Sequence, residues 1–318
     1  MIKIGIISAS SIVRRFLSAC ELVEDMEVVA IASKSGKAKE LAKEFKIGHV
    51  YKSYDQLYED EDIDLVYVAN INDGHFTCII DALNHDKHVI CEKPFVLNPE
   101  EVREAFELSR KKNKYLMECQ KSLFLPVTKH IKNIIDTNEM GKLMMVNMNN
   151  SYSGRIPIGH WMNDRHQGGI WIPSGNYTLE YLNHLIGDIP TEVNYLISRF
   201  GEGAIGDILL SMRYPKDVLV QASLTLRLQT DDMTRFYFEK GFVETHQNWK
   251  ARKISVTYLD DIKNPSVFEY PCEHELVYEL EHIKENIEKG KISSDIVTEE
   301  LTYNCVKLVD DIQNEREV

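Results

Sequence analysis

The chain has 318 residues, of which 43% are hydrophobic and 27% charged, so it is long enough for two domains and apolar enough to bury a core. Its 37 Lys and Arg against 50 Asp and Glu give a formal net charge of −13, which disfavours binding to nucleic acid or to an anionic membrane. Its short apolar runs and the absence of a signal-peptide pattern at residues 1–7 predict a soluble, cytoplasmic protein without a membrane span.

The first 120 residues predict alternating strands and helices. Residues 2–7 have the composition of a buried parallel strand, and Ser10 or Ser11 can cap the helix that follows. Further strands are expected at 28–32, near 50, and at 65–69, 88–91 and 115–118, and further helices at 37–45, around 56–58, at 75–84 and from Pro99. This alternation predicts an α/β fold with a doubly wound parallel sheet, whose ligands bind at the carboxyl ends of the strands.

The remainder of the chain, from a boundary near Gln120, predicts an α+β domain with a mainly antiparallel sheet. Helices are expected at 126–138, 177–186, 274–288 and 298–313, and long strands at 143–152, 192–200, 208–214, 218–228 and 234–239. Turns between the strands are indicated at Gly206, Pro215-Lys216 and Lys240-Gly241. Six cysteines without a CxxC pair predict neither a zinc site nor a disulfide framework.

The turn after the first strand is where such a sheet binds the pyrophosphate of a dinucleotide. The usual glycines are replaced here by the run Ser8-Ala9-Ser10-Ser11-Ile12. Serine can donate to phosphate at a helix N-terminus, although a serine at positive φ costs about 1 kcal/mol relative to glycine. The loop alone leaves two interpretations open, a dinucleotide site or a simple turn of the chain.

Ser33 and Lys34 end the second strand, where an acidic residue would hold the adenosine ribose. They suit the 2′-phosphate of NADP better than a carboxylate would, and the alternative is an exposed lysine on a loop. Glu92-Lys93-Pro94 ends the fifth strand. A lysine there can lie near a nicotinamide and lower the pKa of a neighbouring acid, and the alternative is a solvated surface lysine.

With these motifs the sequence resembles the family of glucose–fructose oxidoreductase, inositol dehydrogenase and dihydrodiol dehydrogenase. The resemblance covers nearly the whole chain and implies a dinucleotide-binding Rossmann domain at 1–120 and a domain for substrate binding and oligomerisation at 121–318. It implies NAD- or NADP-dependent hydride transfer on a sugar, polyol or diol, with subunit association through the open sheet. It rests on Gly5-Ile6-Ile7, Arg14-Arg15-Phe16-Leu17, Ala32-Ser33-Lys34, Asn72-Asp73-Gly74-His75, Glu92-Lys93-Pro94, Glu118, Phe124-Leu125-Pro126, Gly168-Gly169 and Gly175-Asn176-Tyr177.

The resemblance also implies roles for individual residues. Lys93 is the catalytic lysine, and Tyr177 matches the proton-transfer position. The implied cofactor-binding residues are Ser8, Ala9, Ser10, Ser11 and Ile12 at the pyrophosphate, Ser33 and Lys34 at the adenosine ribose, Asn70, Asn72 and His75 near the nicotinamide ribose, and Glu92 with Lys93 beside them.

The chain departs from the family in two places: the phosphate-loop glycines are missing, and Pro173 replaces the site aspartate. Other groups that could replace that aspartate are Asp164, His160, His166 and Asn176, although each also fits a surface or packing role. Two histidines without a third ligand predict no metal site. Tyr177 lies among leucines at helical spacing and could equally be a packed tyrosine.

We therefore expect an NAD(P)-dependent oxidoreductase with a modest preference for NADP, forming a homodimer or a higher homo-oligomer. Tyr177 would exchange the hydroxyl proton of the substrate, and Lys93 would stabilise the negative charge on its oxygen. The alternative is a non-catalytic member of the same fold that binds a dinucleotide or a sugar, which Pro173 and the serine loop favour. A structural interaction module would explain none of the N-terminal motifs.

Overall fold

The structure is a computed structural model that describes residues 1–33, 36–152, 154, 156–157 and 159–316. Two compact units divide the chain between them. Unit 1 comprises Met1–Gln120 and His274–Val306, and unit 2 comprises Lys121–Glu273 and Lys307–Val318. The first break follows Gln120, and a later segment returns to unit 1. The assignment of a binding role to each domain stays a prediction.

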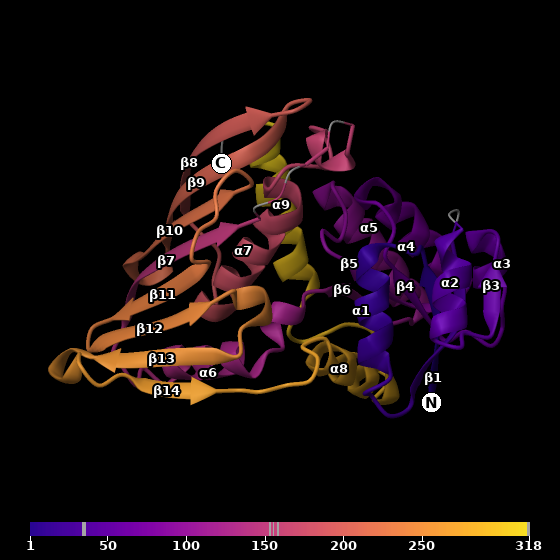
Figure 1. Ribbon diagram of the computed structural model, residues 1–318, viewed down its shortest axis with the longest axis horizontal. Helices are drawn as coiled ribbons and strands as arrows, with labels where there is room; N and C mark the ends of the chain where they lie inside the picture. The colour runs from indigo at the N-terminus through magenta and orange to yellow at the C-terminus, as the bar shows by residue number, and fades with distance from the viewer. Residues whose placement is uncertain (34–35, 153, 155, 158, 317–318) are drawn as a thin grey trace. The chain divides into compact units, whose positions relative to one another are not determined.

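Unit 1 is built on a parallel sheet, sheet A, with the strand order β3-β2-β1-β4-β5-β6 (Figure 1). The order reverses between β1 and β4, so the loops after these strands diverge at the carboxyl edge of the sheet and leave room for a ligand. This confirms the doubly wound sheet. The strands are β1 (Ile2–Ile7), β2 (Met26–Ala32), β3 (His49–Tyr51), β4 (Leu65–Val68), β5 (His88–Glu92) and β6 (Leu116–Cys119), and the helices are α1 (Ser11–Cys20), α2 (Lys37–Glu44), α3 (Tyr54–Tyr58), α4 (His75–Asn84), α5 (Pro99–Lys112) and α8 (Val277–Glu288).

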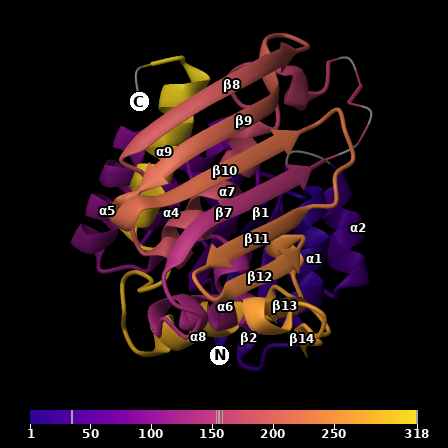
Figure 2. The same cartoon turned by 90° about the vertical axis from the view of Figure 1, so that its left-hand side faces the viewer.

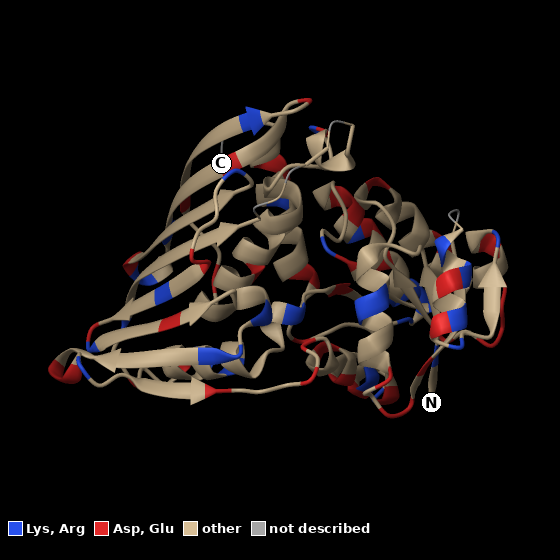
Figure 3. Ribbon diagram, in the orientation of Figure 1, with Lys and Arg blue, Asp and Glu red and all other residues tan. Residues whose placement is uncertain are grey.

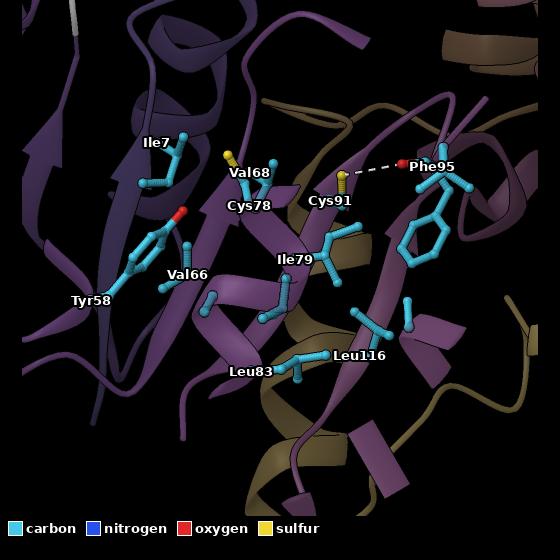
Figure 4. Close-up of a cluster of buried hydrophobic side chains, with 14 of the residues drawn as sticks. Ile7, Tyr58, Val66, Val68, Cys78, Ile79, Leu83, Cys91, Phe95 and Leu116 are labelled. Carbon is cyan, nitrogen blue, oxygen red and sulfur yellow. Dashed lines mark hydrogen bonds between the residues drawn. The ribbon is translucent and has the colours of Figure 1, made fainter. Parts of the chain in front are cut away.

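The core of unit 1 explains why its strands are apolar runs. Helices cover both faces of a parallel sheet, so successive side chains of a strand are all buried. Figure 4 shows one of these faces, where Val66 of β4, Ile79 of α4 and Leu116 of β6 pack with no exposed surface. Gly5 of β1 packs closely against the core: a Cβ there would lie 2.8 Å from the Ile63 Cδ1 atom, so the Ile63 side chain would have to shift.

Unit 2 is built on an eight-stranded sheet, sheet B, with the order β14-β13-β12-β11-β7-β10-β9-β8. β7 and β10 are parallel neighbours, and the other pairs are antiparallel. This confirms the mainly antiparallel sheet. Its strands are β7 (Leu143–Ser151), β8 (Glu192–Phe200), β9 (Ala204–Tyr214), β10 (Val218–Thr225), β11 (Met233–Phe238), β12 (Gly241–His246), β13 (Lys253–Tyr258) and β14 (Ser266–Glu269), and its helices are α6 (Pro126–Asp136), α7 (Trp171–Ile186) and the end of α9 (Glu299–Gln313).

One face of sheet B packs against helices. α7 contacts β9 and β10 on this face, and α6 packs against α7. Figure 2 looks onto the opposite face of the sheet. Three leucines on that face, Leu196, Leu209 and Leu219, are 72%, 54% and 43% exposed. Among the helices that the structure describes, none is long and apolar enough to cross a membrane. All six cysteines are free thiols.

Two sequence predictions about unit 2 were wrong, and three of its strands were missed. α7 begins at Trp171, six residues before the expected start, because Pro173 lies in the first helical turn, where no N–H donor is needed. Gly206 lies inside β9 and is not a turn. The turn before it contains Gly201 and Gly203, whose φ angles are +54° and +97°. The strands β12, β13 and β14 were not predicted.

Candidate functional site

The loop after β1 starts with a residue in an unfavourable backbone conformation. Ser8 has φ +91°, a region that glycine adopts more readily than serine. Its backbone N–H donates to the Ala32 carbonyl at 2.7 Å, which ties the loop to the end of β2. The φ of Ser8 therefore places a serine where the usual fingerprint has glycine.

The N-terminus of α1 is open to an anion. Ser10 is the N-cap residue, but its hydroxyl donates to the Ala69 carbonyl at 2.7 Å and does not cap the helix. The first turn of α1 contains no acidic residue. Its N–H groups can therefore donate to a pyrophosphate. Ala9 and Ile12 are half-buried, and Ser11 is exposed at the first position of the helix.

The ends of β2 and β4 hold the residues expected at the two riboses. Ser33 is half-buried, and Lys34 lies outside the described residues. The Asn70 Nδ2 atom lies 3.6 Å from the Cys78 sulfur. The Asn70 Oδ1 atom is buried and has no hydrogen-bond partner among the described residues. This acceptor fits a ribose hydroxyl, and Asn72 is half-buried two residues further on.

His75 is buried rather than open to a ligand, with 1% of its surface exposed. Its Nδ1 atom lies 2.8 Å from the Pro94 carbonyl oxygen, and its Nε2 atom lies 3.2 Å from the Asn70 carbonyl oxygen. Burial lowers the pKa of His75, which favours the neutral ring. The structure therefore places His75 as a link between the loops after β4 and β5.

The corner after β5 is held at several of its residues. The Tyr67 hydroxyl donates to Glu92 Oε1 at 2.6 Å, and the Lys93 N–H donates to Glu92 Oε2 at 3.3 Å. The Phe95 N–H donates to the buried Glu118 Oε1 at 3.0 Å. These bonds fix the backbone on both sides of Lys93, whose side chain is half-buried.

Glu118 carries a second bond that joins distant segments of unit 1. Its Oε2 atom accepts from the Thr302 hydroxyl at 2.9 Å, and the residue has no exposed surface. A buried carboxylate needs such donors, because an unpaired one would be strongly destabilising. Motif matching had named Glu118 without a role. It had not named Tyr67, whose only signal is a tyrosine among the aliphatic residues of β4.

In unit 2, α7 carries Tyr177 on a helix with an unusual number of buried polar groups. Tyr177 is half-buried, whereas Asn176 and Glu180 have no exposed surface. Asn183 accepts a hydrogen bond from the Tyr214 hydroxyl at 2.7 Å through its Oδ1 atom. Residues 176, 180 and 183 lie on one side of the helix. The sequence analysis missed Glu180, although an acid inside the run Leu179–Leu185 was the available signal.

The four groups considered as replacements for the missing aspartate have different surroundings. Asp164 accepts the His166 N–H at 2.7 Å within its own loop, and His166 is exposed. His160 is exposed and accepts the Met162 N–H. Asn176 is buried, and neither of its amide atoms has a partner among the described residues. Across those residues, no group of three or more His, Cys, Asp or Glu side chains could hold a metal ion.

Gly168 and Gly169 allow the loop before α7 to approach its neighbours closely. A Cβ on Gly168 would lie 2.6 Å from the Met162 carbonyl oxygen. Gly169 has φ +78°, and a Cβ there would lie 2.5 Å from the Ile205 carbonyl oxygen of β9. The Ile170 N–H donates to the same oxygen at 2.8 Å, so this contact sets where α7 begins on the sheet.

Comparison with known proteins gives matches over both parts of the chain. Residues 2–119 match an oxidoreductase family with an NAD-binding Rossmann fold, and residues 128–244 match the GFO/IDH/MocA C-terminal domain. Trans-1,2-dihydrobenzene-1,2-diol dehydrogenase from Sus scrofa is 25% identical over 306 residues, which cover 92% of this chain and 90% of that protein. The scyllo-inositol 2-dehydrogenase (NADP(+)) IolU from Bacillus subtilis is 34% identical over 133 residues, 42% of this chain and 40% of that protein.

Solved structures share the fold. KijD10, a 3-ketoreductase from Actinomadura kijaniata in complex with NADP and TDP-benzene, aligns with a TM-score of 0.87 at 19% identity, over 99% of this chain and 98% of that one. An aldose-aldose oxidoreductase from Caulobacter crescentus aligns with a TM-score of 0.88 at 20% identity, over 98% and 96% of the two chains.

Proposed function

The chain belongs to the GFO/IDH/MocA oxidoreductase family, and from that premise we propose that it transfers a hydride between NAD(P) and a hydroxyl-bearing carbon of a sugar, polyol or diol. The main observation behind the proposal is the corner after β5, where hydrogen bonds fix the backbone on both sides of Lys93. This places a half-buried lysine at the carboxyl edge of a doubly wound sheet. The names of the matched dehydrogenases, which refer to a diol and to inositol, support this substrate class.

The residues at the carboxyl edge of sheet A fit a dinucleotide. In this proposal the N–H groups of Ala9–Ile12 hold the pyrophosphate, because the Ser8 N–H is bonded to the Ala32 carbonyl. Asn70 and Asn72 hold the nicotinamide ribose, with Glu92 beside them. His75 keeps the loops that carry these groups in place. When bound, the cofactor supplies the nicotinamide ring that accepts or donates the hydride.

Two side chains stabilise the developing charge and transfer the proton. Lys93 orients the substrate oxygen and stabilises the negative charge that develops on it, as a fixed cation does. Tyr177 takes or returns the hydroxyl proton. An ordinary phenol has a pKa of about 10, so a neighbouring cation is needed for it to act as a base near neutral pH.

We also propose that NADP is preferred, because Ser33 and Lys34 stand where an acidic residue would repel a 2′-phosphate. Lys34→Ala should then weaken NADPH binding more than NADH binding, measured by fluorescence titration of each cofactor. An equal loss for both cofactors would remove the 2′-phosphate role.

The function is tested by single-turnover hydride transfer, followed at the nicotinamide absorbance with a panel of sugars, polyols and diols. Tyr177→Phe should slow transfer by about 10²–10⁴, the scale of general acid–base catalysis, and leave cofactor affinity unchanged. Tyr181→Phe, one turn further along α7, is the matched control and should transfer at the parent rate. No transfer in the parent with any substrate would favour the non-catalytic, ligand-binding alternative that Pro173 suggests.

The exposed face of sheet B supports self-association. β7 and β10 contain no charged residue, in agreement with their uniform colour in Figure 3. A hollow of about 400 Å³ on this sheet is lined in part by Met145, Leu219 and Gln221. We propose that a second copy of the chain covers the face. Sedimentation velocity should then show a dimer or larger species for the parent and a monomer for Leu196→Glu/Leu209→Glu.

A further inference from the structure

Tyr67 is an exception among the residues of β4. The strand is otherwise Leu65, Val66 and Val68, and all four side chains are buried. An aliphatic residue would suit this strand without a polar group to satisfy, because a buried hydroxyl is destabilising unless it has a partner. The hydroxyl of Tyr67 therefore needs a hydrogen-bond partner in the interior of unit 1.

The ring and the hydroxyl of Tyr67 make separate contacts. The ring stacks on Phe16 of α1, with centroids 3.8 Å apart and planes 12° apart. The hydroxyl donates to Glu92 Oε1, at the end of the neighbouring strand β5. Burial raises the pKa of Tyr67 well above its ordinary value, and the Glu92 charge adds to this effect, so the hydroxyl stays protonated and acts as the donor.

The Glu92 carboxylate connects the Tyr67 hydroxyl to the backbone of Lys93. One oxygen accepts from Tyr67, and the other accepts the Lys93 N–H at 3.3 Å. A carboxylate held at one oxygen cannot rotate freely, so the direction of its second oxygen is set as well. On the other side of Lys93, His75 and Glu118 hold the backbone of Pro94 and Phe95. The Tyr67–Glu92 bond thus restrains the Lys93 backbone from the side of β5.

We propose that Tyr67 is a positioning residue for Lys93, acting through the Glu92 carboxylate rather than by contact with substrate or cofactor. The proposal rests on the proposed function, because the role of Lys93 in hydride transfer belongs to that function. It concerns contacts within unit 1 alone.

Tyr67→Phe keeps the ring stacked on Phe16 and removes only the hydroxyl. We expect kcat to fall by about tenfold to a hundredfold, the range for a reacting group displaced by up to about 1 Å. The substrate KM and the NADPH dissociation constant should stay within about twofold of the parent, because the Tyr67 hydroxyl is buried and bonded to Glu92. A role in folding alone would lower the melting temperature and leave kcat in place.

A double-mutant cycle tests whether Glu92 transmits the effect. If Tyr67 acts through the carboxylate, Tyr67→Phe should cause no further loss of kcat in a Glu92→Ala background. Tyr115→Phe is the matched control, since Tyr115 is also a fully buried tyrosine of unit 1, with its hydroxyl 3.1 Å from the Met117 sulfur. It should leave kcat within about twofold of the parent.

A second measurement does not depend on turnover. The rate at which acetic anhydride acylates Lys93, followed by peptide mass spectrometry, reports the placement and environment of its amine. The rate should change by about threefold or more in Tyr67→Phe, and the exposed Lys37 should label as in the parent. If Tyr67→Phe does not fold, Glu92→Ala breaks the same link at a half-buried position and should alter Lys93 labelling likewise.

The outcomes separate this inference from the proposed function. A parent without hydride transfer would end the proposed function, and the acylation rates would still decide the role of Tyr67. Parent-like kcat and Lys93 labelling in Tyr67→Phe would overturn the inference. So would losses that multiply in the double variant, or an equal loss of kcat in Tyr115→Phe.

Discussion

Ser8→Gly should stabilise unit 1, which is unusual for a substitution by glycine. At φ +91°, serine carries a steric strain of about 1–2 kcal/mol that glycine lacks. Glycine also makes the unfolded chain more flexible, which lowers the free energy of unfolding by about 0.5–1 kcal/mol. The bond from the residue 8 N–H to the Ala32 carbonyl remains. The net gain by these two terms lies between about 0 and 1.5 kcal/mol, with a midpoint of about 0.75 kcal/mol.

Ser10→Gly, two residues further on, should have the opposite sign. Ser10 has φ −70°, which is unstrained, and its hydroxyl bonds to the Ala69 carbonyl. The variant loses that bond, about 0.5–1.5 kcal/mol, and adds about 0.5–1 kcal/mol of chain entropy. The two variants remove the same side chain from one loop, so their difference contains only the backbone strain at Ser8 and the hydrogen bond of the Ser10 hydroxyl.

Amide hydrogen exchange of peptides from β1 and α1 is the suitable assay. Intrinsic fluorescence would not follow unit 1, because the three tryptophans, Trp161, Trp171 and Trp249, all lie in unit 2. The expected gain slows exchange about twofold to fivefold in Ser8→Gly, and Ser10→Gly should exchange faster than the parent. Faster exchange in Ser8→Gly would refute the argument from backbone strain.

Three further predictions concern catalysis, packing and pH. Lys93→Met should keep the parent circular dichroism spectrum and lower turnover by about 10²–10³, and parent-like turnover would remove Lys93 from the mechanism. Gly169→Ala should destabilise unit 2 by more than about 2 kcal/mol in urea unfolding followed by tryptophan fluorescence, well beyond Gly159→Ala, which has a similar φ of +76° but open space around it. Burial lowers the pKa of His184 to about 4. Because an unfolded histidine titrates near about 6.5, the unfolded chain binds a proton that the folded chain does not, and stability should fall as pH drops from 6.5 toward 4. His184→Leu should show a shallower fall, and an unchanged slope would contradict this assignment.

Sheet A could be predicted because its strands are buried on both faces and therefore appear as apolar runs at regular intervals. Sheet B was predicted only in part, since β14 (Ser266–Glu269) is exposed along its whole length and has no apolar alternation. The start of α7 was missed because proline usually marks the end of a helix, and a first-turn position is the exception.

The candidate site divides in the same way. Lys93 could be found because the end of a strand in a doubly wound sheet is where a ligand binds. The groups that hold it could not be found, since Tyr67 and Glu92 lie 25 residues apart and Glu118 and Thr302 lie 184 apart. Such pairings depend on which strands and helices become neighbours, and local periodicity carries no information about that.

The return of His274–Val306 to unit 1 has a consequence for synthesis of the chain on the ribosome. The strands of sheet A emerge before sheet B, but α8 and the first half of α9 emerge only after sheet B. At about 5–20 residues per second, the 184 residues between Glu118 and Thr302 take about 10–40 s to translate. During that interval the Glu118 carboxylate lacks the Thr302 donor, so the nascent Rossmann unit stays incomplete until Thr302 has been translated. Truncation shortly before Thr302 should therefore leave a soluble fragment that binds chaperones rather than a finished nucleotide-binding domain.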